Sequence, residues 1–63
     1  MKQITKNALE AMKRFNPYNE GGDSETYNKI FSACRDLVAL QIIPDEVFAE
    51  VWKLDNKLFK DAQ

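Results

Sequence analysis

The sequence predicts an all-α fold: a small three-helix domain, a helical bundle that we also expect to be completed by homodimerisation. Three segments carry apolar side chains at spacings of three, four and seven residues, as amphipathic helices do. Pro17 and Pro44 separate these segments, and nowhere do apolar and polar residues alternate over the length of a strand. The 63 residues are therefore expected to form one domain, 1–63.

The first helix is expected over residues 3–15, the second over 25–42 and the third over 44–61. Pro17 ends the first helix, because a proline disfavours the helical conformation of the residue before it. Pro44 suits the first turn of the third helix, where its missing amide proton would have no partner within the helix. Each helix should therefore present one apolar face to the other two.

The connection between the first two helices contains Gly21-Gly22, which gives the backbone freedom to turn. Asp23 or Ser24 then offers a side-chain oxygen that caps the second helix. We expect the core to be built from the apolar side chains on the inward faces of the three helices. These are Ile4, Met12, Phe15, Ile30, Phe31, Cys34, Leu37, Val38, Val47, Val51, Leu54 and Leu58.

The net charge of −1 is unevenly spread along the chain. Residues 1–15 carry four basic side chains and one acidic one, whereas residues 16–25 carry three acidic side chains and no basic one. A basic helix surface is a candidate for contact with nucleic acid, although an ordinary solvated helix face has the same composition. The basic residues in question are Lys2, Lys6, Lys13 and Arg14.

The longest apolar runs are a few residues, far short of the roughly 20 that span a bilayer. The first residues also lack the apolar region of a signal peptide. Cys34 is the only cysteine, which excludes an internal disulfide and fits a reducing compartment. We therefore expect a cytoplasmic protein without a membrane partner.

Enzymatic activity, a cofactor and a small-molecule substrate are not expected. The chain has no histidine, the commonest general base near neutral pH. Cys34 falls on the apolar face of the second helix, where a free cysteine usually behaves as a small buried hydrophobe. The loop NEGGDSE lacks the spacing of an EF-hand, and Asp45, Glu46 and Glu50 fit a helix start and a solvated face. No catalytic or metal-binding residue is predicted.

A nucleic-acid-associated regulator is the alternative function, because the second and third helices could be drawn as a helix-turn-helix. A recognition helix brings basic or neutral polar groups to the phosphates and base edges. Here the third helix instead begins with Asp45 and Glu46 and continues to Glu50. The alternative therefore depends on the basic first helix alone.

The third helix carries more apolar surface than one partner helix covers. One stripe, from Val47 to Leu58, belongs to the core set above. A second stripe lies roughly 100° further round the helix and consists of Phe48, Trp52 and Phe59. This second stripe either packs on another helix of the bundle or remains exposed as a contact surface for protein.

Asp55 lies in the same sector as the second stripe and favours the interface. A charge in the middle of a buried face is costly unless paired, so Asp55 should lie at a rim or meet a lysine or arginine. In a homodimer we expect an intersubunit polar contact at Asp55 or Lys57. The predicted function is a non-enzymatic protein-interaction module that self-associates or binds a larger protein. Its interface is formed by Phe48, Trp52, Asp55 and Phe59, with Tyr18 and the NEGGDS loop as secondary contacts.

Two segments are similar to parts of the Hha family of small enterobacterial regulators, which are helical and bind nucleoid-associated partners. The first runs from Phe31 to Leu40, and the second from Ile43 to Trp52. The similarity covers less than half of the chain, requires a gap and lacks the family's basic character, so no functional residue is carried over. The size of the chain alone favours an accessory regulator, such as those of phages and other mobile elements.

Overall fold

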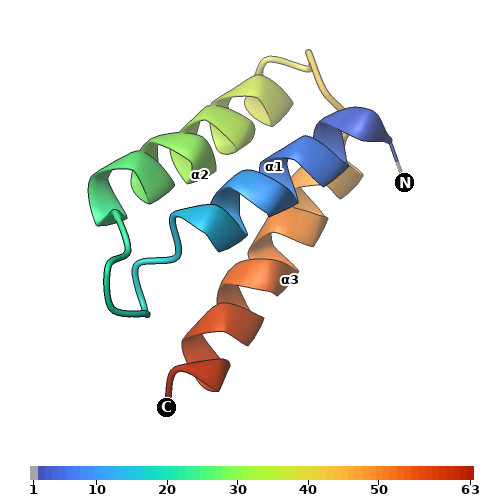
Figure 1. Ribbon diagram of the computed structural model, residues 1–63. Helices are drawn as coiled ribbons and strands as arrows, with labels where there is room; N and C mark the ends of the chain where they lie inside the picture. The colour runs from blue at the N-terminus through green and yellow to red at the C-terminus, as the bar shows by residue number, and fades with distance from the viewer. Residues whose placement is uncertain (1) are drawn as a thin grey trace.

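A computed structural model describes residues 2–63 and contains three helices, α1 (Gln3–Arg14), α2 (Ser24–Ala39) and α3 (Asp45–Asp61) (Figure 1). Each helix packs against both of the others, so the all-α three-helix prediction is confirmed. Pro44 is the residue before α3 rather than its first helical residue, and its carbonyl oxygen accepts a hydrogen bond of 3.1 Å from Val47 N–H.

The core forms where the three helices meet. Met12, Val47 and Val51 are completely buried, and the buried Cys34 packs in one cluster with Met12 and Val51, as predicted. Tyr27 and Ile43 are also buried but were not among the predicted core residues. Most of the remaining predicted core residues are half-buried around this centre: Phe15, Ile30, Phe31, Leu37, Val38, Leu54 and Leu58.

Ile4 was wrongly predicted to be in the core. Its side chain is 43% exposed, whereas the neighbouring Thr5 is only 4% exposed. Thr5 and the buried Met12 are seven residues apart and share one side of the helix, so the inward face of α1 passes through Thr5. One residue corresponds to about 100° of rotation on a helix, which is enough to turn Ile4 toward solvent.

The α1–α2 connection is held by local hydrogen bonds. Asn16 is buried, and its side-chain oxygen accepts a hydrogen bond of 3.0 Å from Tyr18 N–H. A Cβ atom at Gly22 would overlap the carbonyl oxygen of Asn16, so this position requires glycine. Asp23 caps α2 by accepting hydrogen bonds from Thr26 N–H and from the Thr26 hydroxyl, and the first of these bonds lowers the pKa of Asp23. This connection fixes the position of Tyr18.

The second helix ends at Ala39, three residues before the predicted end. Gln41 has a positive φ of 61°, and its N–H donates to the carbonyl oxygen of Val38. Ile42 N–H donates to the carbonyl oxygen of Leu37 at 2.9 Å. These two bonds form a Schellman motif, in which a left-handed residue turns the chain out of the helix and satisfies its last carbonyl groups. Glycine usually occupies this position, so the glutamine gave no sequence signal for the end of the helix.

Candidate protein interface

An aromatic surface runs along one side of α3 and continues onto α2 and the α1–α2 connection. Trp52 is 53% exposed and Phe59 is 49% exposed, and Tyr18 is 36% exposed beside them. Phe48 and Phe31 complete this surface and are partly buried against the core. The aromatic surface is thus defined by Tyr18, Phe31, Phe48, Trp52 and Phe59.

Three rings of this surface form a cluster where α2 meets α3. The ring centroid of Phe31 lies 5.3 Å from that of Phe48 and 5.9 Å from that of Trp52. The Phe48 and Trp52 centroids are 6.3 Å apart. Such separations and tilted orientations are favourable for aromatic side chains. Phe31 therefore anchors the inner edge of Trp52, while about half of the Trp52 side chain stays in solvent.

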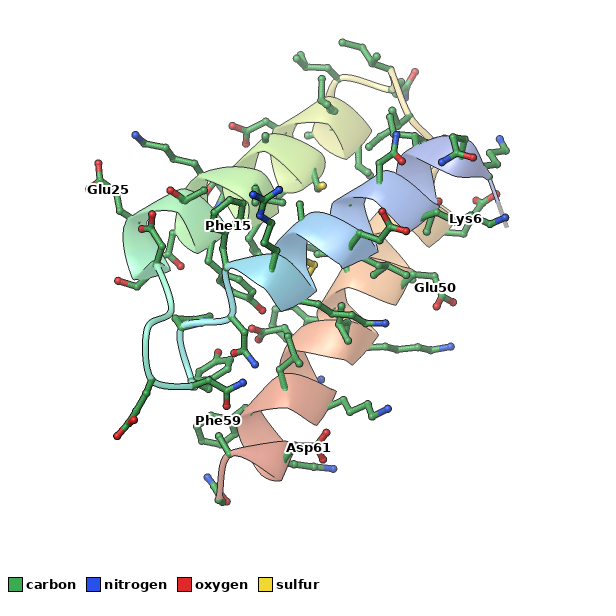
Figure 2. All side chains as sticks on the ribbon, viewed as in Figure 1. Lys6, Phe15, Glu25, Glu50, Phe59 and Asp61 are labelled. Atoms are coloured by element: carbon green, nitrogen blue, oxygen red, sulfur yellow. The ribbon has the colours of Figure 1, made fainter. Side chains whose placement is uncertain are left out.

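The other exposed end of the surface is formed by Phe59 and Tyr18. Their ring centroids are 5.5 Å apart in an edge-to-face arrangement, and Tyr18 makes a second such contact with Tyr27 at 6.2 Å. Phe59 lies near the carboxyl end of α3, close to the α1–α2 connection (Figure 2). The predicted stripe of Phe48, Trp52 and Phe59 is therefore divided between two aromatic clusters.

Asp55 lies on α3 between these two clusters. Its Oδ1 atom accepts a hydrogen bond of 2.9 Å from the Tyr18 hydroxyl and another of 2.6 Å from the Tyr27 hydroxyl. The pKa of both tyrosine hydroxyls is raised. Burial is the largest cause, and the hydrogen bond to Asp55 and the negative charge of Asp55 add to it. The sequence predicts a rim position or a basic partner for Asp55, whereas its partners within the chain are the hydroxyls of Tyr18 and Tyr27.

A groove opens between α2 and α3 on this side of the molecule. It has a volume of about 420 Å³, and its walls include the side chains of Tyr18, Tyr27, Phe31 and Trp52. Asp55 also lines it and is the only charged residue among the described residues that do so. The groove thus combines aromatic walls with one carboxylate.

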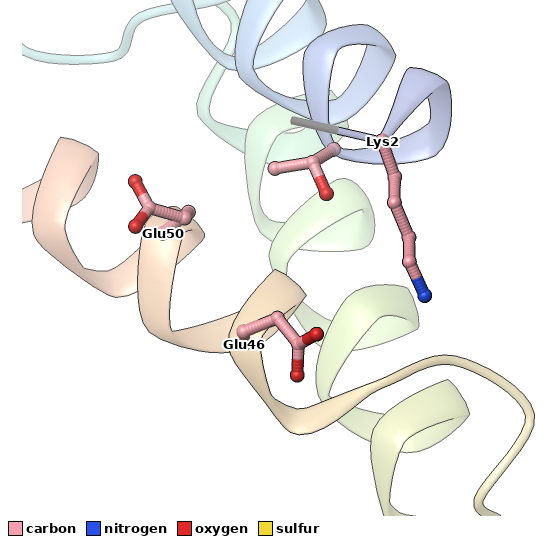
Figure 3. Close-up of a pocket in the computed structure, with 4 residues that line it drawn as sticks. Lys2, Glu46 and Glu50 are labelled. Atoms are coloured by element: carbon pink, nitrogen blue, oxygen red, sulfur yellow. The ribbon is translucent and has the colours of Figure 1, made fainter.

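The basic residues of α1 and the preceding Lys2 lie around three separate hollows. Lys2 lines a hollow of about 600 Å³ together with Glu46 and Glu50 of α3 (Figure 3). Lys6 and Lys13 border another hollow with Glu10.

Arg14 also borders a hollow that includes Glu10, and its guanidinium carbon lies 5.6 Å from the centroid of the Phe15 ring. Each basic residue proposed for nucleic-acid contact therefore has a glutamate around the same hollow.

The single cysteine contributes to the core rather than to an accessible site. Cys34 is buried, and this burial raises the pKa of its thiol, which disfavours the nucleophilic thiolate. Among residues 2–63, no group of three or more His, Cys, Asp or Glu side chains is placed to hold a metal ion. Within the same residues, no helix combines the length and the apolar character required to cross a membrane.

No protein-family model matches this sequence, and comparison with curated proteins and with solved structures also finds no match. The function is therefore inferred from the aromatic surface and the groove.

Proposed function

We propose that the chain is a non-enzymatic protein-interaction module, an accessory regulatory protein that binds a larger protein through the aromatic surface. The observation that carries this proposal is the exposure of Trp52 and Phe59, which leave about half of their side chains in solvent on the same side of α3. Clustered exposed apolar side chains usually mark interaction sites, and tryptophan and tyrosine are enriched among the residues that dominate binding energy.

The geometry around Trp52 supports this assignment. Phe31 and Phe48 pack against the indole, and this packing restricts the conformations open to Trp52 before a partner arrives. A side chain that is already ordered loses less conformational entropy on binding. Trp52 also borders the groove and can contribute to a contact that extends from α3 to α2.

A larger protein that supplies a basic side chain for Asp55 is the partner that we propose for this surface. Asp55 lies between Trp52 and Phe59, near the middle of the aromatic surface. A two-fold symmetric dimer brings the same patch of both subunits together. In such a dimer each Asp55 carboxylate would be covered by the other subunit and would need a basic side chain of that subunit as its partner. Homodimerisation remains a prediction that a mass measurement in solution decides.

The nucleic-acid alternative receives less support from the surface of α1. Binding to nucleic-acid phosphates requires lysine or arginine side chains that can replace the counterions of the nucleic acid. The glutamates that line the same hollows, Glu46 and Glu50 with Lys2 and Glu10 with Lys6, would weaken the attraction of phosphate to these lysines. We therefore retain protein binding as the proposed function.

The experiment is a cross-linking capture from a lysate of the native host with three forms of the protein. Trp52→Glu places a charge on the aromatic surface, and Ala33→Glu places the same charge on an exposed position of α2. We expect a discrete partner with wild type and Ala33→Glu that is lost with Trp52→Glu. Capture that is equal for the two variants, with both folded by circular dichroism, would contradict the proposal.

A further inference from the structure

We propose that the groove between α2 and α3 receives an arginine side chain of the partner protein. This inference rests on the proposed function and names the chemistry that the surface recognises. It follows from the charge of the groove, from the nature of its walls, and from the way in which Asp55 is held.

The groove carries one negative charge, and no basic side chain among the described residues that line it neutralises this charge. Asp55 contributes a carboxylate, and the other described lining residues are aromatic or carry polar, uncharged side chains or proline. The adjoining segment 16–25 adds three acidic residues and no basic one, of which Glu25 is paired with Lys29 at 3.3 Å, and Pro17, Tyr18 and Ser24 of that segment line the groove. A cation entering the groove would therefore meet attraction from both sources.

The walls favour a cation that is also planar. Of the aromatic side chains that line the groove, Tyr18, Phe31 and Trp52 are exposed or half-buried, and the faces of aromatic rings attract cations through their quadrupole. A guanidinium group stacks on aromatic rings and is more weakly hydrated than an ammonium group. Arginine is therefore a better fit than lysine.

Hydrogen bonds within the chain position the carboxylate for this contact. Both tyrosine hydroxyls donate to Oδ1 of Asp55, so Oδ2 accepts from neither of them. A guanidinium group offers several N–H donors in a fixed plane and can donate to Oδ2 while it lies against the rings. The tyrosines thus act as positioning residues, and Asp55 as the anion that receives the ligand.

The test uses three blocked tripeptides, acetyl-Ala-Xaa-Ala-amide, in which the central residue is arginine, lysine or citrulline. Citrulline has nearly the shape of arginine without its charge. Trp52 is the only tryptophan and lines the groove, so its fluorescence reports occupancy. We expect a saturable change with the arginine peptide, a weaker one with lysine and none with citrulline.

Two charge-neutralising variants on α3 complete the design. Asp55→Asn retains an oxygen that can accept the tyrosine hydrogen bonds, and should bind the arginine peptide roughly tenfold more weakly, as expected for loss of a charge-assisted hydrogen bond. Glu50→Gln removes the same charge outside the groove and should bind as wild type does.

Three outcomes would overturn the inference: no saturation with the arginine peptide, binding of citrulline or lysine as tight as that of arginine, or unchanged binding by Asp55→Asn. None of these outcomes affects the capture experiment with Trp52→Glu. A groove that fails to take arginine and a surface that fails to bind protein are therefore distinguishable results.

Discussion

The Tyr27 hydroxyl donates a hydrogen bond of 2.6 Å to Oδ1 of Asp55, which joins α2 to α3 beneath the aromatic surface. The Tyr27 side chain is buried, so its hydroxyl requires a partner within the protein. Tyr18 reaches the same oxygen from the α1–α2 connection. One carboxylate therefore links three parts of the chain and sets the position of two rings that line the groove.

Removal of the Asp55 carboxylate should destabilise the fold. We expect Asp55→Ala to lower the free energy of unfolding by about 1 to 3 kcal/mol, because the hydroxyl of buried Tyr27 loses its acceptor. Asp55→Asn should cost less, since the amide oxygen can still accept. Urea denaturation measures both. Equal stability of Asp55→Ala and wild type would show that the two hydrogen bonds contribute nothing in solution.

The tyrosines should make the protein sensitive to alkali. Burial and Asp55 raise the pKa of Tyr18 and Tyr27 above the ordinary value of 10.0. The folded state then holds the two hydroxyl protons more tightly than the unfolded state does. The stabilisation from the two protonated tyrosines is therefore complete below pH 10, and it is lost as the pH rises through the pKa values of the folded state. Urea denaturation across this range measures the loss.

The ionisation of the two tyrosines can also be followed directly by absorbance, which serves as a control for the stability measurement. Tyr18 and Tyr27 are the only tyrosines, so tyrosinate absorbance follows these two groups alone. In Asp55→Asn the carboxylate charge no longer disfavours tyrosinate, and both groups should ionise at lower pH than in wild type. Identical titration curves for the two proteins would mean that Asp55 does not contact the tyrosines.

The α1–α2 connection should tolerate substitution at one glycine and not at the other. Gly22→Ala should lower the free energy of unfolding by about 1 to 3 kcal/mol, because the new methyl group overlaps the Asn16 carbonyl oxygen. Gly21→Asn is the control: space is open around its Cβ, and asparagine tolerates the left-handed conformation at φ 78°. A similar loss in both variants would place the strain elsewhere in the connection.

A glycine should stabilise the carboxyl end of α2 at one position only. Gln41 occupies the left-handed region, which costs a residue with a Cβ atom about 1 to 2 kcal/mol. Gln41→Gly should therefore raise the midpoint of thermal unfolding. Leu40→Gly, one residue earlier at φ −83°, should lower it. The opposite order of the two midpoints would be inconsistent with a Schellman motif at this position.

Much of the fold could be predicted because the strongest signals are local. Helical spacing identified the three helices, and it placed Met12, Val47 and Val51 in the core. The errors lie at the ends of helices. There, Ile4 or Thr5 can face inward with a small rotation, and Gln41 terminates α2 without the glycine that usually indicates this motif.

The site was only partly predictable, because it depends on contacts between segments far apart in the chain. Phe48, Trp52 and Phe59 were recognised as excess apolar surface, but Phe31 and Tyr18, which pack on them, come from other elements. Asp55 required a partner on an apolar face, and the hydroxyl of Tyr27 on the inner face of α2 required one too. The need of both polar groups for a partner was the one signal in the sequence that could have indicated the hydrogen bond between Tyr27 and Asp55.

The measurement that tests the central claim most directly is the dissociation constant for the captured partner, determined with wild type, Trp52→Glu and Ala33→Glu. A side chain that dominates an interface contributes at least about 2 kcal/mol, so Trp52→Glu should bind at least about thirtyfold more weakly. Ala33→Glu should match wild type. Equal dissociation constants for all three folded proteins would contradict the assignment of the aromatic surface as the protein interface.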